Sequence, residues 1–121
     1  MLKTRILVVD DHMEFAESLK DLLEVQGYEA WAVYSGHDAL KEVKKEKFDI
    51  VLMDTRMPLM SGVDALIEIK KINPSFVVIL MTGFSVEDVI KNALNEGALA
   101  VLNKPLDIPK LLKCFESIRN E

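Results

Sequence analysis

Five polar side chains that could take part in one reaction follow apolar stretches of the chain. They are Asp10, Asp11, Asp54, Thr82 and Lys104. Three carboxylates in one pocket repel one another, and either protonation or a bound cation would relieve that repulsion. Mg²⁺ takes oxygen ligands and is usually held by one or two carboxylates with waters and a phosphate. A metal, a lysine ammonium and a hydroxyl around one carboxylate indicate phosphoryl transfer, in which the aspartate itself can accept the phosphoryl group.

The apolar stretches before these residues are typical of parallel strands that are covered on both faces. Four continuous runs cover residues 6–9, 50–53, 76–81 and 99–102. Residues 28–34 form a less uniform run, broken by Glu29, which predicts an edge strand. Ligands of an open α/β sheet bind beyond the carboxyl ends of the strands, so we expect the polar residues to meet at that edge.

Apolar residues repeat with helical spacing in the segments that alternate with these runs. The periodic segments are 15–23, 39–43, 63–67, 86–94 and 108–115. Ser85 with Asp88 predicts a capping box for the fourth helix, and Asp107 is a suitable N-cap for the fifth. Five strands alternating with five helices predict an α/β fold with a parallel sheet, right-handed crossovers and helices on both faces.

Length and charge predict one domain that does not bind nucleic acid directly. The 121 residues are enough for a single domain, residues 1–121. There are 20 acidic and 15 basic residues, a net charge of −5, whereas a protein that binds a phosphate backbone normally has a basic patch. The single cysteine, Cys114, fits a reducing compartment, and we find neither a signal peptide nor an apolar run near the ~20 residues that span a bilayer. We therefore expect a cytoplasmic protein with no membrane partner.

Four stretches together resemble a response-regulator receiver domain of two-component signalling, of the chemotaxis-receiver type. They are ILVVDD (6–11), VLMDTRMPLMSG (51–62), MTG (81–83) and NKP (103–105), in this order and over essentially the whole chain. The resemblance implies a doubly wound, five-stranded parallel sheet of the flavodoxin-like kind, with strand order 2-1-3-4-5. It also implies a role for each polar residue.

The resemblance assigns Asp54 as the phosphoacceptor and places a metal beside it. Asp11 resembles the direct ligand of Mg²⁺, for which Mn²⁺ can substitute, and Asp10 resembles the residue that reaches the ion through water. Asp54 itself and the backbone carbonyl of Arg56 complete the implied metal ligands. Thr82 resembles the hydroxyl that bonds the phosphoryl group and moves on activation.

Lys104 resembles the lysine that pairs with the phosphoryl group, and its bond to Pro105 is implied to be cis. The chain departs from the family at Val101, where receivers often carry the aromatic residue whose rotation follows that of Thr82. We therefore expect the signal to pass through Thr82, the loop after it and the fourth helix. We also expect Arg56 and Phe84 to slow acyl-phosphate hydrolysis, with plain loop surface as the alternative.

The resemblance implies a phosphorylation-dependent signalling switch. It would take a phosphoryl group from the phosphohistidine of a histidine kinase or phosphotransfer protein, which would dock near the first helix. The fourth helix, fifth strand and fifth helix would form the face that controls a downstream effector protein or domain, or that forms a homodimer. It would catalyse only its own phosphotransfer and autodephosphorylation, so it is not an enzyme in the usual sense.

Three other functions use parts of the same pattern. A haloacid-dehalogenase-type phosphohydrolase also forms an aspartyl phosphate, but it needs a second acid where Arg56 stands. A flavodoxin-like nucleotide-binding module needs a phosphate-binding loop where the chain has two aspartates. A pure interaction module would not need all five polar residues. His12 lacks a second His or Cys at metal-ligand spacing, which favours a surface residue at a helix start.

Overall fold

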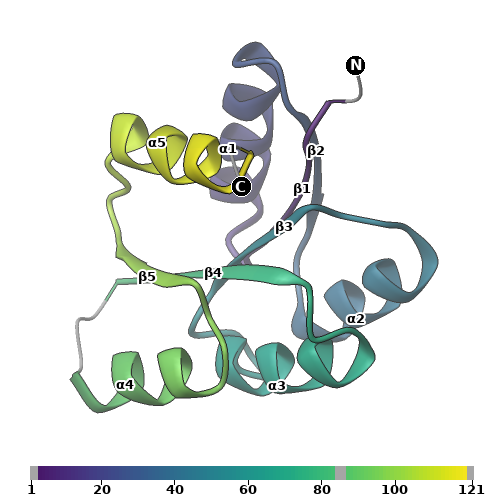
Figure 1. Cartoon of the computed structure of the whole chain (residues 1–121), viewed down its shortest axis with the longest axis vertical. Helices are drawn as coiled ribbons and strands as arrows, with labels where there is room; N and C mark the ends of the chain where they lie inside the picture. The colour runs from purple at the N-terminus through teal and green to yellow at the C-terminus, as the bar shows by residue number, and fades with distance from the viewer. Residues whose placement is uncertain (1–2, 84–86, 120–121) are drawn as a thin grey trace.

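The computed structural model describes residues 3–83 and 87–119, and it has one sheet of five strands with helices on both sides (Figure 1). The strands are β1 (Arg5–Val9), β2 (Glu29–Val33), β3 (Ile50–Asp54), β4 (Val77–Thr82) and β5 (Ala100–Asn103). The helices are α1 (Met13–Val25), α2 (Gly36–Lys45), α3 (Gly62–Ile72), α4 (Glu87–Asn95) and α5 (Ile108–Arg119). None of the described helices is long and apolar enough to cross a bilayer.

The sheet is parallel throughout, with strand order β2-β1-β3-β4-β5. This confirms the predicted doubly wound α/β fold and the edge position of β2. β2 lies on one side of β1, and β3, the next strand in the sequence, lies on the other side. The direction in which successive strands are added to the sheet therefore reverses at β1. In folds of this kind, a ligand site forms beyond the carboxyl ends of the strands at such a point.

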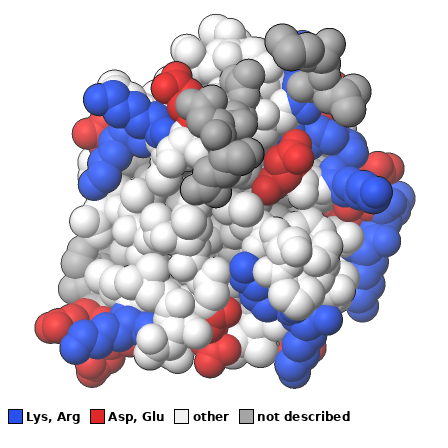
Figure 2. Space-filling view, viewed as in Figure 1, with Lys and Arg blue, Asp and Glu red and all other residues white. Residues whose placement is uncertain are grey.

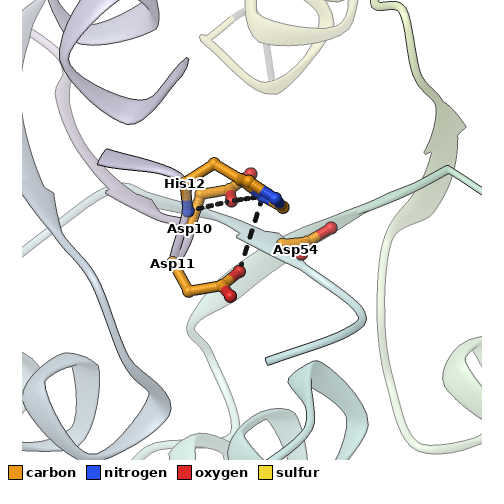
Figure 3. Close-up of side chains that lie close together, drawn as sticks. All are labelled: Asp10, Asp11, His12 and Asp54. Atoms are coloured by element: carbon orange, nitrogen blue, oxygen red, sulfur yellow. Dashed lines mark hydrogen bonds and ion pairs between the residues drawn. The ribbon is translucent and has the colours of Figure 1, made fainter. Parts of the chain in front are cut away.

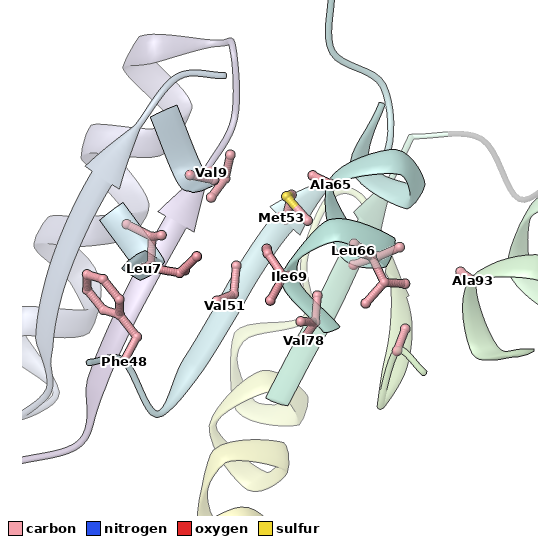
Figure 4. Close-up of a cluster of buried hydrophobic side chains, with 14 of the residues drawn as sticks. Leu7, Val9, Phe48, Val51, Met53, Ala65, Leu66, Ile69, Val78 and Ala93 are labelled. Carbon is pink, nitrogen blue, oxygen red and sulfur yellow. The ribbon is translucent and has the colours of Figure 1, made fainter. Parts of the chain in front are cut away.

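Each face of the sheet has its own hydrophobic core. Within β1, Leu7 and Val9 point to the core formed with α2, α3 and α4, while Ile6 and Val8 point to the core formed with α1 and α5. All four side chains are fully buried. Successive side chains of a strand alternate between faces, so a continuous apolar run is the pattern that a doubly covered strand requires. Figure 4 shows the first core, in which Leu66 and Ile69 of α3 pack over the sheet.

Local signals set where several helices begin. Ser61 and Asp64 form a capping box at the start of α3, with the Ser61 hydroxyl accepting from the Asp64 N–H and the Asp64 carboxylate accepting from the Ser61 N–H. Asp107 accepts from the Lys110 N–H at 3.1 Å, which confirms the predicted start of α5. The capping box predicted from Ser85 lies outside the described residues.

Candidate functional site

Strand register brings the predicted polar residues to one end of the sheet. Asp10 and Asp11 directly follow β1, and Asp54 and Thr82 are the last residues of β3 and β4. Thr82 lies opposite Asn103, the last residue of β5, so Lys104 comes next to the same edge. Asp10, Asp54 and Thr82 are 0%, 4% and 3% exposed, whereas 30% of the Asp11 side chain is exposed, so the pocket is buried at its base and open to solvent at Asp11.

Lys104 joins two of the carboxylates. Its ammonium donates to Asp10 Oδ2 at 2.6 Å and lies 3.2 Å from Asp54 Oδ1, while the Phe15 ring lies under it at 4.4 Å. Burial lowers the pKa of Lys104, but the hydrogen bond to Asp10 and the charge of Asp54 outweigh burial and hold that pKa above its usual value. The lysine therefore stays charged at neutral pH and acts as a fixed cation between the acids.

Asp54 is held in surroundings that disfavour its charge. Burial raises the pKa of Asp54, and the neighbouring charge of Asp10 raises it further, while Lys104 acts in the opposite direction and only partly offsets them. The positive charge of Lys104 alone therefore does not offset the cost of ionising Asp54. A cation bound beside Asp54 would stabilise the ionised carboxylate further.

Asp10, Asp11, Asp54 and His12 can each offer one ligand atom within 4.8 Å of one another (Figure 3). Asp10 Oδ1 accepts from the His12 N–H at 3.0 Å and faces His12 Nδ1 at 3.2 Å. Asp11 Oδ1 is a buried oxygen without a hydrogen-bond partner among the described residues; His12 Nδ1, at 3.6 Å, is beyond bonding range. A buried, unpaired carboxylate oxygen beside two other carboxylates fits the oxygen-rich ligand set that Mg²⁺ prefers.

Three of the other predicted site features can be placed among the described residues. Arg56 is exposed and lines a cavity of about 290 Å³ with Thr82, between the loop after β3 and α4. Val101 is partly buried and packs against the core on the α2–α4 side of the sheet. The Lys104–Pro105 peptide bond is cis. Phe84 lies outside the described residues.

Two features of the site were not expected from the sequence. A Cβ added to Gly62 would lie 2.2 Å from the carbonyl oxygen of Asp54, so the start of α3 approaches the end of β3 more closely than any side chain allows. His12 turns its ring toward the carboxylates, although its side chain is 74% exposed. The glycine closing the stretch 51–62 and the histidine directly after two aspartates are the signals that could have drawn attention to them.

Comparison with known proteins finds similarity over nearly the whole chain. The family model described as response regulator receiver domain matches residues 6–116. Transcriptional regulatory protein ZraR of Salmonella typhimurium is 45% identical over 114 residues, which cover 94% of this chain but only 26% of that protein. The chain thus spans about a quarter of the length of this relative. Sporulation initiation phosphotransferase F of Bacillus subtilis is 34% identical over 92% of this chain and 90% of that protein.

Solved structures agree with the sequence comparison. A response regulator receiver domain protein from Clostridium thermocellum superposes with a TM-score of 0.91 at 35% identity, covering 97% of this chain and 94% of that one. A CheY-like receiver domain protein from Methanospirillum hungatei superposes with a TM-score of 0.92 at 32% identity, covering 98% and 96%. The sheet order and the helix layers are therefore shared with proteins of known structure.

Proposed function

Because the chain belongs to the response regulator receiver domain family, whose members act in phosphorylation-dependent two-component signalling, we propose that its own phosphoacceptor is Asp54. The donor is the phosphohistidine of a histidine kinase or phosphotransfer protein. An Asp54 carboxylate oxygen attacks phosphorus, an O–P bond forms, and the P–N bond breaks as the donor imidazole leaves and takes up a proton. The product is an acyl phosphate on Asp54. The observation that carries this proposal is the buried Asp54 carboxylate 3.2 Å from the Lys104 ammonium.

Each residue of the pocket has a defined part in this transfer. Asp11, Asp54 and the Arg56 carbonyl would hold Mg²⁺, or Mn²⁺ in its place, with Asp10 acting through water. When bound, the ion neutralises charge that develops on the phosphoryl oxygens and helps to orient them. Lys104 supplies a second, fixed positive charge, and burial excludes the bulk water that would hydrolyse the product.

Phosphorylation changes the hydrogen-bond partners of the Lys104 ammonium and the Thr82 hydroxyl. The phosphoryl group adds a charge of about −1.5 to −2 and three acceptor oxygens at Asp54. Thr82 donates its hydroxyl to one of them, and Lys104 shifts from its bonds to the two aspartates toward another. Since Thr82 ends β4 and leads toward α4, its movement biases that helix, while Val101 offers no aromatic ring to follow it. Arg56, which lines the cavity next to Thr82, slows hydrolysis of the phosphoryl group. The same role for Phe84 rests only on its place in the sequence, two residues after Thr82.

Two surfaces are suited to the proposed partners. An apolar groove of about 270 Å³ between α1 and the segment before α5, lined by Phe15, Leu22 and Pro105, is suited to a helix of the phosphoryl donor. On the other side of the molecule α4 exposes Val89 and Leu94, and the loop just before β5 exposes Leu99. Figure 2 shows largely uncharged surface over β4 and β5 in the middle of the view, while charged side chains gather at the lower left, where α4 lies. We assign this α4–β5–α5 face to an effector protein or domain, or to a homodimer.

We assign residues 1–121 to a single cytoplasmic receiver domain that modifies only itself, by phosphotransfer and autodephosphorylation.

Incubation with acetyl phosphate and Mg²⁺, followed by intact-protein mass spectrometry, tests the phosphoacceptor. The expected result is the addition of one phosphoryl group, lost in Asp54→Asn and after chelation of the metal. The control variant Asp38→Asn changes an exposed acid at the start of α2 and should be modified like the wild type. Equal modification of Asp54→Asn would overturn the assignment.

A further inference from the structure

We propose that His12 is a metal ligand of this site, so that the pocket binds nitrogen-preferring divalent ions such as Ni²⁺ and Zn²⁺ more tightly than its carboxylates alone would. The inference rests on the proposed function in one respect, which is that the same carboxylates hold the resident ion. It adds a residue and an ion preference to that site. The observation behind it is that an imidazole nitrogen lies among the carboxylate oxygens (Figure 3).

The spacing of the ligand atoms is that of neighbours around one ion. His12 Nδ1 lies 3.2 Å from Asp10 Oδ1 and 3.6 Å from Asp11 Oδ1. Ligand atoms ~2.1 Å from a common metal are ~3.0 Å apart when octahedral neighbours and ~3.4 Å apart when tetrahedral neighbours. His12 Nδ1 and Asp11 Oδ1 therefore need only small shifts to share an ion, while Asp10, assigned above to act through water, stays beside them.

The bonds of Lys104 leave an oxygen available on the histidine side of the pocket. The ammonium engages Asp10 Oδ2 and Asp54 Oδ1. Asp10 Oδ1 accepts from the His12 N–H and faces His12 Nδ1, whereas Asp11 Oδ1 is buried with no hydrogen-bond partner in the described part of the chain and is therefore the available oxygen. That unpaired oxygen indicates a missing positive partner, and the nearest imidazole nitrogen, His12 Nδ1, lies 3.6 Å from it.

The histidine ring is not needed to begin helix α1. His12 is the N-cap residue, yet its side chain makes no capping hydrogen bond, and the ring is 74% exposed. A ring that satisfies no helix N–H and is not part of either core can move onto a metal at little cost in stability. Imidazole suits Zn²⁺, Ni²⁺ and Cu²⁺, whereas Mg²⁺ prefers oxygen, so the nitrogen favours the former ions selectively.

Calorimetric titration with Ni²⁺ alone and with Mg²⁺ alone tests this assignment on the full chain, with no phosphoryl donor present. Removing a group that only orients a metal ligand weakens metal binding by at least ~10-fold. We therefore expect His12→Gln, which removes a ligand itself, to weaken Ni²⁺ binding by at least this factor. Its Mg²⁺ affinity should change much less. The matched control is His37→Gln, which removes the other histidine, exposed in the first turn of α2, and should leave Ni²⁺ binding unchanged.

Three further measurements separate this site from adventitious binding. Saturating Mg²⁺ should weaken Ni²⁺ binding in competition, and the loss caused by His12→Gln should shrink in an Asp11→Asn background, because both residues hold one ion. With Zn²⁺, the ring ¹⁵N resonances of His12 should shift in NMR spectra while those of His37 stay in place. Circular dichroism checks that the variants are folded.

An unchanged Ni²⁺ affinity in His12→Gln, or Ni²⁺ binding that Mg²⁺ does not compete with, would overturn the inference. An unshifted His12 ring at saturating Zn²⁺ would overturn it as well. Failure of the proposed function would appear elsewhere, as absence of phosphoryl uptake by the wild-type chain with Mg²⁺. The two results are therefore independent.

Discussion

Replacing Asp54 by asparagine should stabilise the metal-free domain at neutral pH. Asparagine has nearly the same shape, keeps an oxygen that can accept from Lys104, and removes a buried charge. Lys104 also keeps its 2.6 Å bond to Asp10, so the substitution leaves no orphaned cation. The substitution thus tests whether ionised Asp54 costs stability before metal or phosphoryl group is bound.

The magnitude follows from the charges around Asp54. Carboxylates at the 4.8 Å limit of the ligand group repel by about 3.5 kcal/mol at an effective dielectric constant of 20, and Asp10 and Asp11 both act in this way. The attraction between Lys104 and Asp54, at 3.2 Å, stabilises the ionised carboxylate by about 5 kcal/mol at the same dielectric constant. Repulsion therefore exceeds attraction by roughly 2 kcal/mol before any cost of burial. Allowing for the weaker bond that asparagine makes to the lysine, we expect a gain of about 1–2 kcal/mol in the free energy of unfolding.

Urea unfolding in a chelating buffer measures this difference, with Trp31 as reporter because it is the single tryptophan and packs against Phe48. The raised pKa of Asp54 means that the folded state takes up a proton more readily than the unfolded state. The wild type therefore loses stability as pH rises from the unfolded pKa through the higher folded pKa, and below the unfolded value the two proteins should be equally stable. Asp21→Asn, at an exposed acid, is the control and should change stability by less than about 0.5 kcal/mol.

Adding Mg²⁺ should narrow or reverse the difference, since the wild type retains a ligand that the variant lacks. Saturation at 100 times the dissociation constant stabilises a protein by about 2.7 kcal/mol. Equal or lower stability of Asp54→Asn in chelator at neutral pH would refute the reasoning about charge in this pocket.

Three further substitutions test the elements around the site by urea unfolding. Gly62→Ala should lower the free energy of unfolding by about 1–3 kcal/mol or more, since its Cβ would meet a backbone oxygen at 2.2 Å. The control Gly83→Ala, with open space around it, should lower it by under about 1 kcal/mol, and similar losses in the two variants would contradict the close approach. Ser61→Ala should cost about 1 kcal/mol through loss of the α3 cap, with Ser61→Thr restoring most of it; no recovery would argue against a capping role. Leu66→Ala, at a fully buried position, should cost about 2–5 kcal/mol, and a loss below 1 kcal/mol would contradict its place in the core.

The strands were predictable because buried parallel strands need apolar residues on both faces. Leu7 and Val8 face opposite cores, so the run they belong to could be recognised without knowing which helix covers which side. Strand ends were less certain. Leu99 looks like part of the fifth run, but it is 52% exposed and β5 begins at Ala100, because an apolar side chain alone does not distinguish a strand residue from the loop before it.

The edge at which the site lies could be predicted, but the orientation of its side chains could not. The switch-point rule places Asp10 and Asp54 at the same end of the sheet. The direction of the His12 ring depends on the extended backbone of an N-cap residue, with φ −82° and ψ 94°. The contact of Gly62 with the end of β3 depends on the path of the intervening loop. Both are long-range results of packing, which spacing in the sequence does not encode.

The most direct test of the account is to locate the phosphoryl group chemically. After phosphoryl transfer from a phosphohistidine donor in the presence of Mg²⁺, borohydride reduces an acyl phosphate to an alcohol, and peptide mass spectrometry identifies the modified residue. We expect homoserine at position 54 in the wild type and none when the metal is chelated. Reduction at another aspartate or glutamate, with Asp54 unmodified, would contradict the assignment of Asp54 as the phosphoacceptor.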